Sequence, residues 1–362
     1  MPRPTQITID LQALRNNARL ARQRAEGKKI MAAVKADAYG HGLAVCATTL
    51  APFVDAFATA FCEEAKALHA LALDRPVLVL EGPFDLEDWE TIIATDSWAV
   101  LHSEEQLTSL ESLDRPLQEK LRNNIWLKVD TGMHRLGVAP NAVASLLTRL
   151  ARIGIVAPTI ISHLGNGEDA ADPLTQGQVK TWQALVDALK LPKSLLNSAG
   201  FSQRLSTDCD WHRLGYMLYG GSSVPKATPA RLHPVMTLTS QVMALRHIPT
   251  GDVVGYGGRW KAQRDSVIAT VAVGYGDGYP RTANDGTPVL INGVICPLVG
   301  RVSMDMITVD VTDHDSVTVG SPVQLWGDQL SVDRVASHAQ TIGYELLTRL
   351  PNRLPRLLSG DP

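Results

Sequence analysis

The stretch Ile30–Gly42, IMAAVKADAYGHG, joins a short apolar run to a polar loop that contains two glycines. Residues 30–34 are apolar at every position, which predicts a strand buried on both faces. Lys35 ends this run, and an amine that loses solvent at such a position can act as a nucleophile. Tyr39 can donate a hydrogen bond to an anionic ligand, which the flanking glycines allow the backbone to approach. A solvated lysine at the end of a strand is the alternative interpretation.

Composition places the chain among large globular proteins. It has 362 residues, 45% of them apolar, which favours a large barrel together with a second domain. The formal net charge of −3 gives no reason to expect a nucleic-acid or membrane-surface partner. The four cysteines are scattered without a CxxC pair, so we expect reduced thiols and no metal site. The N-terminal segment lacks the apolar core of a signal peptide, and we expect a cytoplasmic protein.

Strand-like and helix-like segments alternate through the first two thirds of the chain. Eight short apolar runs read as strands: 30–34, 56–61, 77–80, 98–101, 125–129, 158–161, 195–196 and 214–218. Segments with helical spacing separate most of them, at 63–73, 87–94, 103–113, 141–152 and 175–189. This alternation predicts a (β/α)8 TIM-type barrel over residues 1–230. No GxGxxG turn follows the first strand of the alternation, which argues against a dinucleotide-binding fold.

Beyond about residue 230 the pattern changes to successive strands with short turns. We expect strands at 235–248, 266–273, 288–299, 304–311 and 317–325, and helices at 332–340 and 345–350. The pair Asn292-Gly293 is a strong signal for a hairpin turn. These features predict a mostly antiparallel β domain over residues 231–362. A strand at residues 5–9, followed by a helix that Asp10 caps, can pair with this domain.

Polar side chains stand at the ends of several predicted barrel strands. Lys35 follows the first strand, Lys128 the fifth, His163 the sixth and Ser198 the seventh, and Arg213 enters the eighth. The carboxyl ends of barrel strands converge on one face, where active sites are built. We therefore expect these side chains to share one site.

Each of these motifs, taken alone, also has a structural interpretation. Lys128 and Arg135, in WLKVDTGMHRLG, can clamp an anionic group or belong to an ion-paired loop. His163 can be a core histidine, and NSAG at 197–200 can hold a phosphate or form a plain turn. In the second domain, the glycine-rich segments GYGG, GYGDGY and GRVSMDM can be catalytic loops or tight hairpins.

Together these motifs resemble those of the alanine racemases, pyridoxal-phosphate enzymes built from a barrel and a β domain. The resemblance runs in order through nearly the whole chain and is carried by the segments AVKADAYGHG, KVDTGMHRLG, ISHLGNG, NSAG, HRLGYMLYG, VGYGGRW, VGYGDGYPR and GRVSMDM. It implies interconversion of L-alanine and D-alanine, either to supply D-alanine for peptidoglycan or to degrade it. It also implies pyridoxal 5′-phosphate as the cofactor and a homodimer as the active form.

The resemblance further implies roles for individual residues. Lys35 would bind the cofactor covalently and act as the base on the D-face of the substrate, and Tyr256 would be the opposing base on the L-face. The remaining cofactor contacts would be Tyr39, His163, Ser198, Arg213, Gly215 and Tyr216. Arg213 would face the pyridine nitrogen.

Substrate contacts follow from the same resemblance. Arg135 would lie near the substrate carboxylate, Met304 would give it a backbone donor, and Tyr275 would line the entrance. Lys128 matches a position that is carbamylated in family members, where it helps to orient the arginine. Tyr256 and Met304 would reach the site from the other subunit.

The chemistry of racemisation agrees with this set of residues. A carbanion at Cα requires an electron sink, and reprotonation on either side requires two bases on opposite faces. Arginine does not readily give up a proton, so it would not protonate the pyridine nitrogen as a carboxylic acid would. We expect a weaker electron sink, which suppresses transamination and favours simple reprotonation.

Two positions depart from the family pattern. Many relatives have a tyrosine near the C-terminus that also binds phosphate, and Asn352 stands in its apparent place, which leaves that contact open. Ser194 stands where some members have a histidine that supports the arginine at the pyridine ring.

Other functions fit these residues less well than this resemblance does. A related pyridoxal-phosphate decarboxylase would be expected to have an acidic residue where Arg213 stands. An exported broad-specificity racemase would be expected to have a signal segment. A non-catalytic cofactor carrier resembles the barrel alone, and a barrel hydrolase would leave Lys35, Arg213 and Tyr256 without a role.

Overall fold

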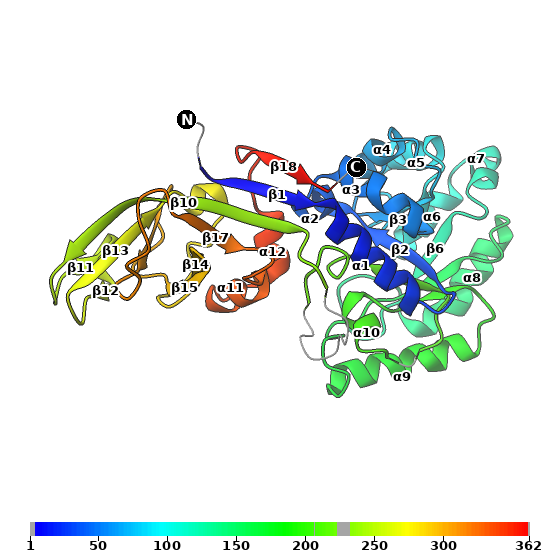
Figure 1. The fold of residues 1–362 in the computed structure, drawn as a ribbon. Coiled ribbons are helices and arrows are strands. Elements are labelled where there is room, and N and C mark those ends of the chain that lie inside the picture. Colours follow the sequence, from blue (N-terminus) through cyan, green and yellow to red (C-terminus); the bar gives the residue numbers. More distant parts are fainter. Residues whose placement is uncertain (1–3, 206, 223–231, 361–362) are drawn as a thin grey trace.

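The computed structural model describes residues 4–205, 207–222 and 232–360. Figure 1 shows a barrel of strands and helices and a second, strand-rich domain that extends away from one side of it. The boundary expected between residues 230 and 231 lies outside the described residues.

Within the described residues, the barrel contains eight parallel strands. They are β2 (Lys29–Ala33), β3 (Ala56–Thr59), β4 (Val77–Val79), β5 (Trp98–Leu101), β6 (Ile125–Lys128), β7 (Thr159–Ile161), β8 (Lys193–Ser194) and β9 (Trp211–Leu214). They pair in the order β8-β7-β6-β5-β4-β3-β2-β9. Backbone hydrogen bonds from Arg213 N to Leu196 O (3.0 Å) and from Asp210 N to Lys193 O (2.9 Å) join the segments around β8 and β9 and close the barrel. The predicted (β/α)8 fold is confirmed.

Two strands lie earlier in the chain than the apolar runs indicated. We expected strands at 195–196 and 214–218, whereas β8 ends at Ser194 and β9 ends at Leu214. The leucines after β8 are buried in an irregular segment, and the chain turns after Gly215. Their apolar character therefore reflects burial and not strand pairing. Arg213 lies inside the last strand of the barrel.

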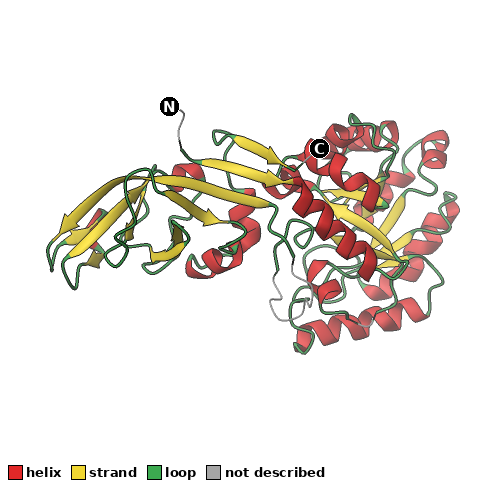
Figure 2. Ribbon diagram, viewed as in Figure 1, coloured by secondary structure: helices red, strands yellow, loops and turns green. Residues whose placement is uncertain are grey.

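Helices surround the barrel (Figure 2). They are α1 (Leu11–Arg24), α3 (Leu43–Leu50), α4 (Cys62–His69), α5 (Leu86–Ala94), α6 (Glu104–Glu111), α7 (Arg115–Lys120), α8 (Val143–Arg152), α9 (Pro173–Asp187) and α10 (Ser198–Ser202). The Asp10 carboxylate accepts a hydrogen bond from Ala13 N at 2.9 Å, which confirms it as the N-cap of α1. Helices α3, α7 and α10 were not expected from the sequence.

Aromatic rings fill one end of the barrel interior. Trp98, Trp126 and Trp211 lie at or next to the first residues of their strands, with ring centroids 5.5 to 5.8 Å apart. They close the amino ends of the strands. The carboxyl ends, where barrel enzymes build their sites, remain available for polar side chains.

The second domain is built mainly on an antiparallel sheet. Its strands are β1 (Gln6–Asp10), β10 (Met236–Ile248), β13 (Ser266–Val271), β14 (Pro288–Ile291), β15 (Val294–Pro297), β16 (Ile307–Asp310), β17 (Pro322–Trp326) and β18 (Arg356–Ser359). A separate two-stranded ribbon consists of β11 (Val253–Val254) and β12 (Trp260–Lys261). The hairpin expected at Asn292-Gly293 is confirmed, since both residues have positive φ (+50° and +81°) between β14 and β15.

The first strand of the chain belongs to this second sheet. β1 pairs antiparallel with β10, with Ile7 opposite Leu238, and parallel with β18, with Ile7 opposite Arg356. The side chains of Ile7 and Ile9 are completely buried. The two ends of the chain are therefore joined in one sheet before α1 begins the barrel (Figure 1).

Two helices of the second domain, α11 (Val332–His338) and α12 (Gly343–Thr348), return toward the barrel. Helix α12 packs against the segment α2 (Lys35–Gly40), which follows the first barrel strand. The approach is close enough that a Cβ at Gly40 would collide with the carbonyl oxygen of Leu347. The second domain thus contributes to the surroundings of Lys35.

Candidate active site

Lys35 lies between the end of β2 and a left-handed turn. Residues 36–39 all have φ between +52° and +55°, a conformation that costs an L-residue roughly 1–2 kcal/mol. Contacts with neighbouring elements must therefore hold the turn. Glu64 does so at its start, because its carboxylate accepts hydrogen bonds from Ala36 N at 2.6 Å and from Ala60 N at 2.7 Å.

A small cradle lies between Tyr39, Gly215 and Ser198. The Tyr39 hydroxyl rests against Gly215, at a place that a Cβ would fill. Ser198 Oγ accepts hydrogen bonds from Gly215 N at 3.0 Å and from Met217 N at 3.4 Å. Hydroxyl and backbone N–H groups gathered around one space are suitable donors for a phosphate.

Arg213 is a buried cation with oxygen atoms around it. Its guanidinium donates to Ser194 Oγ at 2.7 Å and to Ser162 O at 2.5 Å, and it lies 3.2 Å from His163 Nδ1. Burial lowers the pKa of Arg213 to about 10, so the group stays charged at neutral pH. Burial and the charge of Arg213 hold the pKa of His163 well below its usual range, so the imidazole is neutral.

Lys128 ends β6 on the same face of the barrel. Its burial, opposed by the carboxylate of Glu81 and reinforced by cations that include Arg213 and Arg135, lowers its pKa to about 8. A lysine with this pKa is partly neutral near pH 8, whereas an exposed lysine is almost fully charged. The amine is therefore available for reactions that need its lone pair.

The loop after β6 presents Arg135. Asp130 organises this loop, because its Oδ1 accepts hydrogen bonds from the backbone N–H groups of Gly132, Met133 and His134 at 2.9 to 3.1 Å. The positive φ of Gly132 (+132°) fits this tight turn.

One cavity of about 500 Å³ brings most of the predicted site together. The predicted residues that line it are Lys35, Tyr39, Lys128, Arg135, His163, Ser198, Arg213, Gly215 and Tyr216. Tyr256, Tyr275 and Met304 do not line it. A single chain therefore assembles the barrel half of the predicted site. It leaves out Tyr256 and Met304, which we expected from the other subunit, and also Tyr275, which we expected at the entrance.

The three remaining residues lie exposed on loops of the second domain. Tyr256 is 70% exposed and Met304 is 55% exposed. Tyr275 and Met304 belong to neighbouring loops, which are joined by hydrogen bonds from Tyr275 N to Ser303 O (3.0 Å) and from Gly276 N to Met304 O (2.8 Å). Large apolar and aromatic side chains held in solvent in this way are typical of a surface that meets another molecule.

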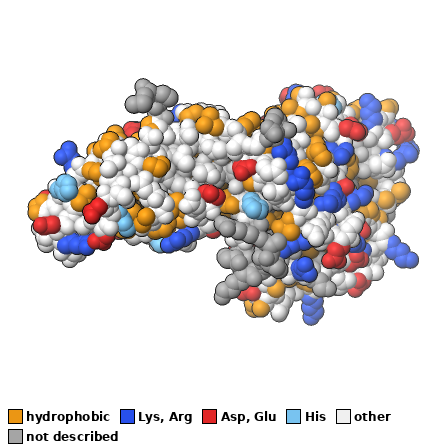
Figure 3. Space-filling view, in the orientation of Figure 1, with side chains coloured by type: hydrophobic (Ala, Val, Ile, Leu, Met, Phe, Trp, Pro, Cys, Tyr) orange, Lys and Arg blue, Asp and Glu red, His pale blue; other side chains and the backbone are white. Residues whose placement is uncertain are grey.

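Other kinds of site find little support. Within residues 4–205, 207–222 and 232–360, no group of three or more His, Cys, Asp or Glu side chains could hold a metal ion. None of the helices in these ranges is both long and apolar enough to cross a bilayer. Figure 3 shows acidic and basic side chains interspersed over the barrel face in view.

Comparison with protein families identifies the chain. Residues 9–223 match the alanine racemase N-terminal domain, and residues 235–358 match the alanine racemase C-terminal domain. The chain belongs to the alanine racemase family. The activity of this family makes the chain an isomerase, and the predicted resemblance is confirmed.

Individual alanine racemases are similar to the chain over its full length. The catabolic alanine racemase of Pseudomonas aeruginosa is 44% identical over 363 residues, covering 99% of each chain. The crystal structure of the biosynthetic enzyme from the same species has a TM-score of 0.93 at 41% identity, covering 99% of this chain and all of that one. The alanine racemase of Bartonella henselae, with covalently bound pyridoxal phosphate, has a TM-score of 0.88 at 31% identity, with 99% and 100% coverage.

The cavity of this alanine racemase family member also contains a tyrosine that our sequence reasoning missed. Tyr344, at the start of α12, lines the cavity and stacks on Tyr216 with ring centroids 3.8 Å apart. Asn352, which we placed at the position of the C-terminal tyrosine of relatives, is not a lining residue, and its Oδ1 lies 3.5 Å from Arg356 Nη1. Tyr344 could have been found as a tyrosine at a predicted helix start near the C-terminus.

Proposed function

We propose that the chain racemises alanine with pyridoxal 5′-phosphate by a two-base mechanism, with Lys35 acting on the D-face and Tyr256 on the L-face. The observation that carries the proposal is the convergence of Lys35, Arg135 and Arg213 in one cavity. The reaction needs a lysine for covalent attachment, a cation that binds a carboxylate, and a cation that does not readily give up a proton; Lys35, Arg135 and Arg213 match these needs.

The residues of the cavity fit the cofactor. The cradle at Gly215, which a Cβ would fill, offers the Tyr39 and Ser198 hydroxyls to a phosphate. Tyr344 and the backbone of Tyr216 complete that end, and Arg213 and the neutral His163 would lie at the ring. When bound, the cofactor supplies the electron sink that a Cα carbanion needs.

Two bases would remove the α-proton and return it to Cα. Lys35, in the cavity, would exchange the proton on one face of Cα. Tyr256 of the partner subunit would exchange it on the other face, because the chain's own Tyr256 is exposed away from its own cavity. Arg213 remains positively charged and transfers no proton, which keeps the electron sink weak and favours return of the proton to Cα.

Arg135 would orient the substrate. Its guanidinium can hold the alanine carboxylate, and Lys128 beside it, once carbamylated, would supply a negative charge that fixes the arginine. The low pKa of Lys128, about 8, supports this modification because only a neutral amine adds to carbon dioxide. Met304 of the partner subunit would add a backbone donor to the carboxylate, and Tyr275 would line the entrance.

The cellular role follows from the direction in which the enzyme works. Relatives named as catabolic and as biosynthetic are similarly close, at 44% and 41% identity. The same site serves either use, supplying D-alanine for peptidoglycan or degrading it.

The proposal is tested with the purified protein and pyridoxal phosphate. We expect a visible absorption band that borohydride removes and D-alanine that accumulates from L-alanine. The Tyr256→Phe variant should slow α-deuterium exchange from L-alanine far more than exchange from D-alanine. Equal exchange from both enantiomers in that variant would rule out the role of Tyr256. A band with release of carbon dioxide from lysine, ornithine or arginine would identify a decarboxylase instead.

A further inference from the structure

His41 lies directly behind the turn that presents Lys35 and Tyr39. It is 1% exposed, and its Nδ1 lies 3.0 Å from Ala38 O and 2.9 Å from Tyr39 O. Carbonyl oxygens only accept hydrogen bonds, so Nδ1 must carry the proton and donate to both. Burial lowers the pKa of His41 to about 4, which keeps this neutral form over the physiological range.

These two hydrogen bonds act on a strained part of the backbone. Ala38 and Tyr39 are the last two residues of the left-handed turn, with φ of +53° and +55°. Glu64 fixes the N–H group of Ala36 at the beginning of the turn. His41 thus holds the end of the turn from which the Tyr39 side chain extends into the cavity.

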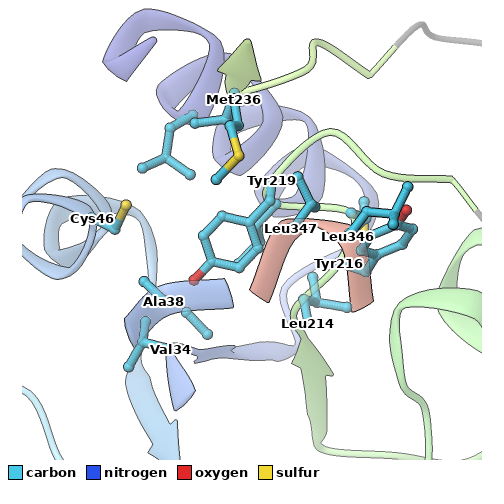
Figure 4. Close-up of a cluster of buried hydrophobic side chains, with 14 of the residues drawn as sticks. Val34, Ala38, Cys46, Leu214, Tyr216, Tyr219, Met236, Leu346 and Leu347 are labelled. Atoms are coloured by element: carbon cyan, nitrogen blue, oxygen red, sulfur yellow. The ribbon is translucent and has the colours of Figure 1, made fainter. Parts of the chain in front are cut away.

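Tyr219 links His41 to the ring of Tyr39. The Tyr219 ring stacks on His41, with centroids 4.6 Å apart, and on Tyr39, with centroids 4.9 Å apart. Its hydroxyl donates to Ala33 O at 3.0 Å, two residues before Lys35. Figure 4 shows the Tyr219 hydroxyl pointing toward Ala38 within the buried cluster. His41 therefore holds the backbone of the turn, and Tyr219 holds the ring of Tyr39.

We infer that His41 is a positioning residue for the racemase reaction, whose Nδ1–H fixes the left-handed turn and thereby the places of Lys35 and of the Tyr39 hydroxyl at the phosphate. The inference rests on the proposed function, since it assigns His41 a task in cofactor binding. His41 does not line the cavity, so it acts through the turn and does not touch the bound molecules.

Two substitutions separate the hydrogen bonds from the ring. His41→Phe keeps a ring to stack on Tyr219 and loses the donor, whereas His41→Asn loses the ring and keeps an amide N–H near the position of Nδ1. His338→Phe is the matched control, because His338 Nδ1 also bonds a backbone carbonyl, Arg334 O at 3.0 Å, in an exposed right-handed helix. Cofactor affinity is measured by absorbance titration of the apoenzyme, and backbone mobility at residues 36–43 by hydrogen exchange.

We expect His41→Phe to raise the cofactor dissociation constant about tenfold or more, because the Tyr39 carbonyl loses its imidazole donor and the Ala38 carbonyl keeps only the backbone N–H of residue 41. Hydrogen exchange at residues 36–43 should become faster in this variant. His41→Asn and His338→Phe should bind the cofactor within about threefold of the unmodified chain, as expected when no buried bond is lost. The inference would be overturned if His41→Phe left the cofactor affinity and the hydrogen exchange unchanged. It would also be overturned if His41→Asn lost as much cofactor affinity as His41→Phe. An unmodified chain that binds no cofactor would instead overturn the proposed function.

Discussion

Arg213 and Ser194 form a hydrogen bond of 2.7 Å between adjacent strands of the barrel. The Ser194 hydroxyl donates in turn to Trp211 O at 2.9 Å, which turns its lone pairs toward the guanidinium. A serine thus supports the arginine at a position where some relatives have a histidine. The buried cation that would face the cofactor ring is fixed by a short, neutral side chain.

Replacing Ser194 with alanine should weaken this support. We expect kcat/KM to fall about tenfold, in the range of a hydrogen bond to a charged group. Ser162→Ala is the control, because the Ser162 hydroxyl bonds Thr131 at 2.9 Å while its carbonyl, which holds Arg213, is retained. Full activity in Ser194→Ala, measured in both directions, would show that the backbone carbonyls suffice.

Lys128 should form a carbamate in a pH-dependent manner. Because burial lowers its pKa to about 8, the neutral amine increases as the pH rises through 8, while ordinary lysines remain charged there. NMR spectra of the protein in ¹³C-bicarbonate should show a carbamate signal that grows over this range. Lys128→Arg should abolish the signal. A signal that persists in that variant would belong to another amine.

The close contact between Gly215 and Tyr39 predicts an effect on cofactor binding. In Gly215→Ala the added Cβ would collide with the Tyr39 hydroxyl and displace it from the cradle. We expect the cofactor dissociation constant to rise about tenfold or more, consistent with loss of a hydrogen bond to a charged group. Gly177→Ala in α9 is the control, since nothing lies within 4 Å of its added Cβ. Equal affinities in the two variants would show that the cradle adapts.

Mixed dimers test whether two chains share each site. Lys35→Ala and Tyr256→Phe should each be nearly inactive alone. A dimer that contains one chain of each kind would retain one site with both bases intact, because Tyr256 is exposed away from its own chain's cavity. Coexpression with two affinity tags isolates that species. If the mixed dimer has no more activity than its parents, both bases act within one chain.

The sequence predicted those parts of the fold and site that depend on local patterns. The apolar run before Lys35 and the alternation of strands and helices predicted the barrel. The strand ends then brought Lys128, His163 and Arg213 to one face. The pair Asn292-Gly293 predicted a hairpin because its turn requires positive φ.

What the sequence did not reveal depends on contacts between distant segments. Tyr344 reaches the cavity because α12 packs on the turn after Lys35. The spacing of apolar residues does not predict a contact between two segments so far apart in the sequence. The left-handed turn at residues 36–39 contains two alanines and a tyrosine, which favour right-handed backbone. Its conformation is imposed by Glu64 and His41, which lie outside it.

The pairing of β1 with two late strands limits when this part of the sheet can form during synthesis. β1 is synthesised before the barrel, yet its neighbours β10 and β18 are made more than two hundred residues later. The barrel can fold while β1 is still unpaired, but this part of the sheet forms only after β10 and β18 have been made. Proteolytic loss of β18 alone would turn β1 into an open edge strand, a surface on which other chains can pair and aggregate.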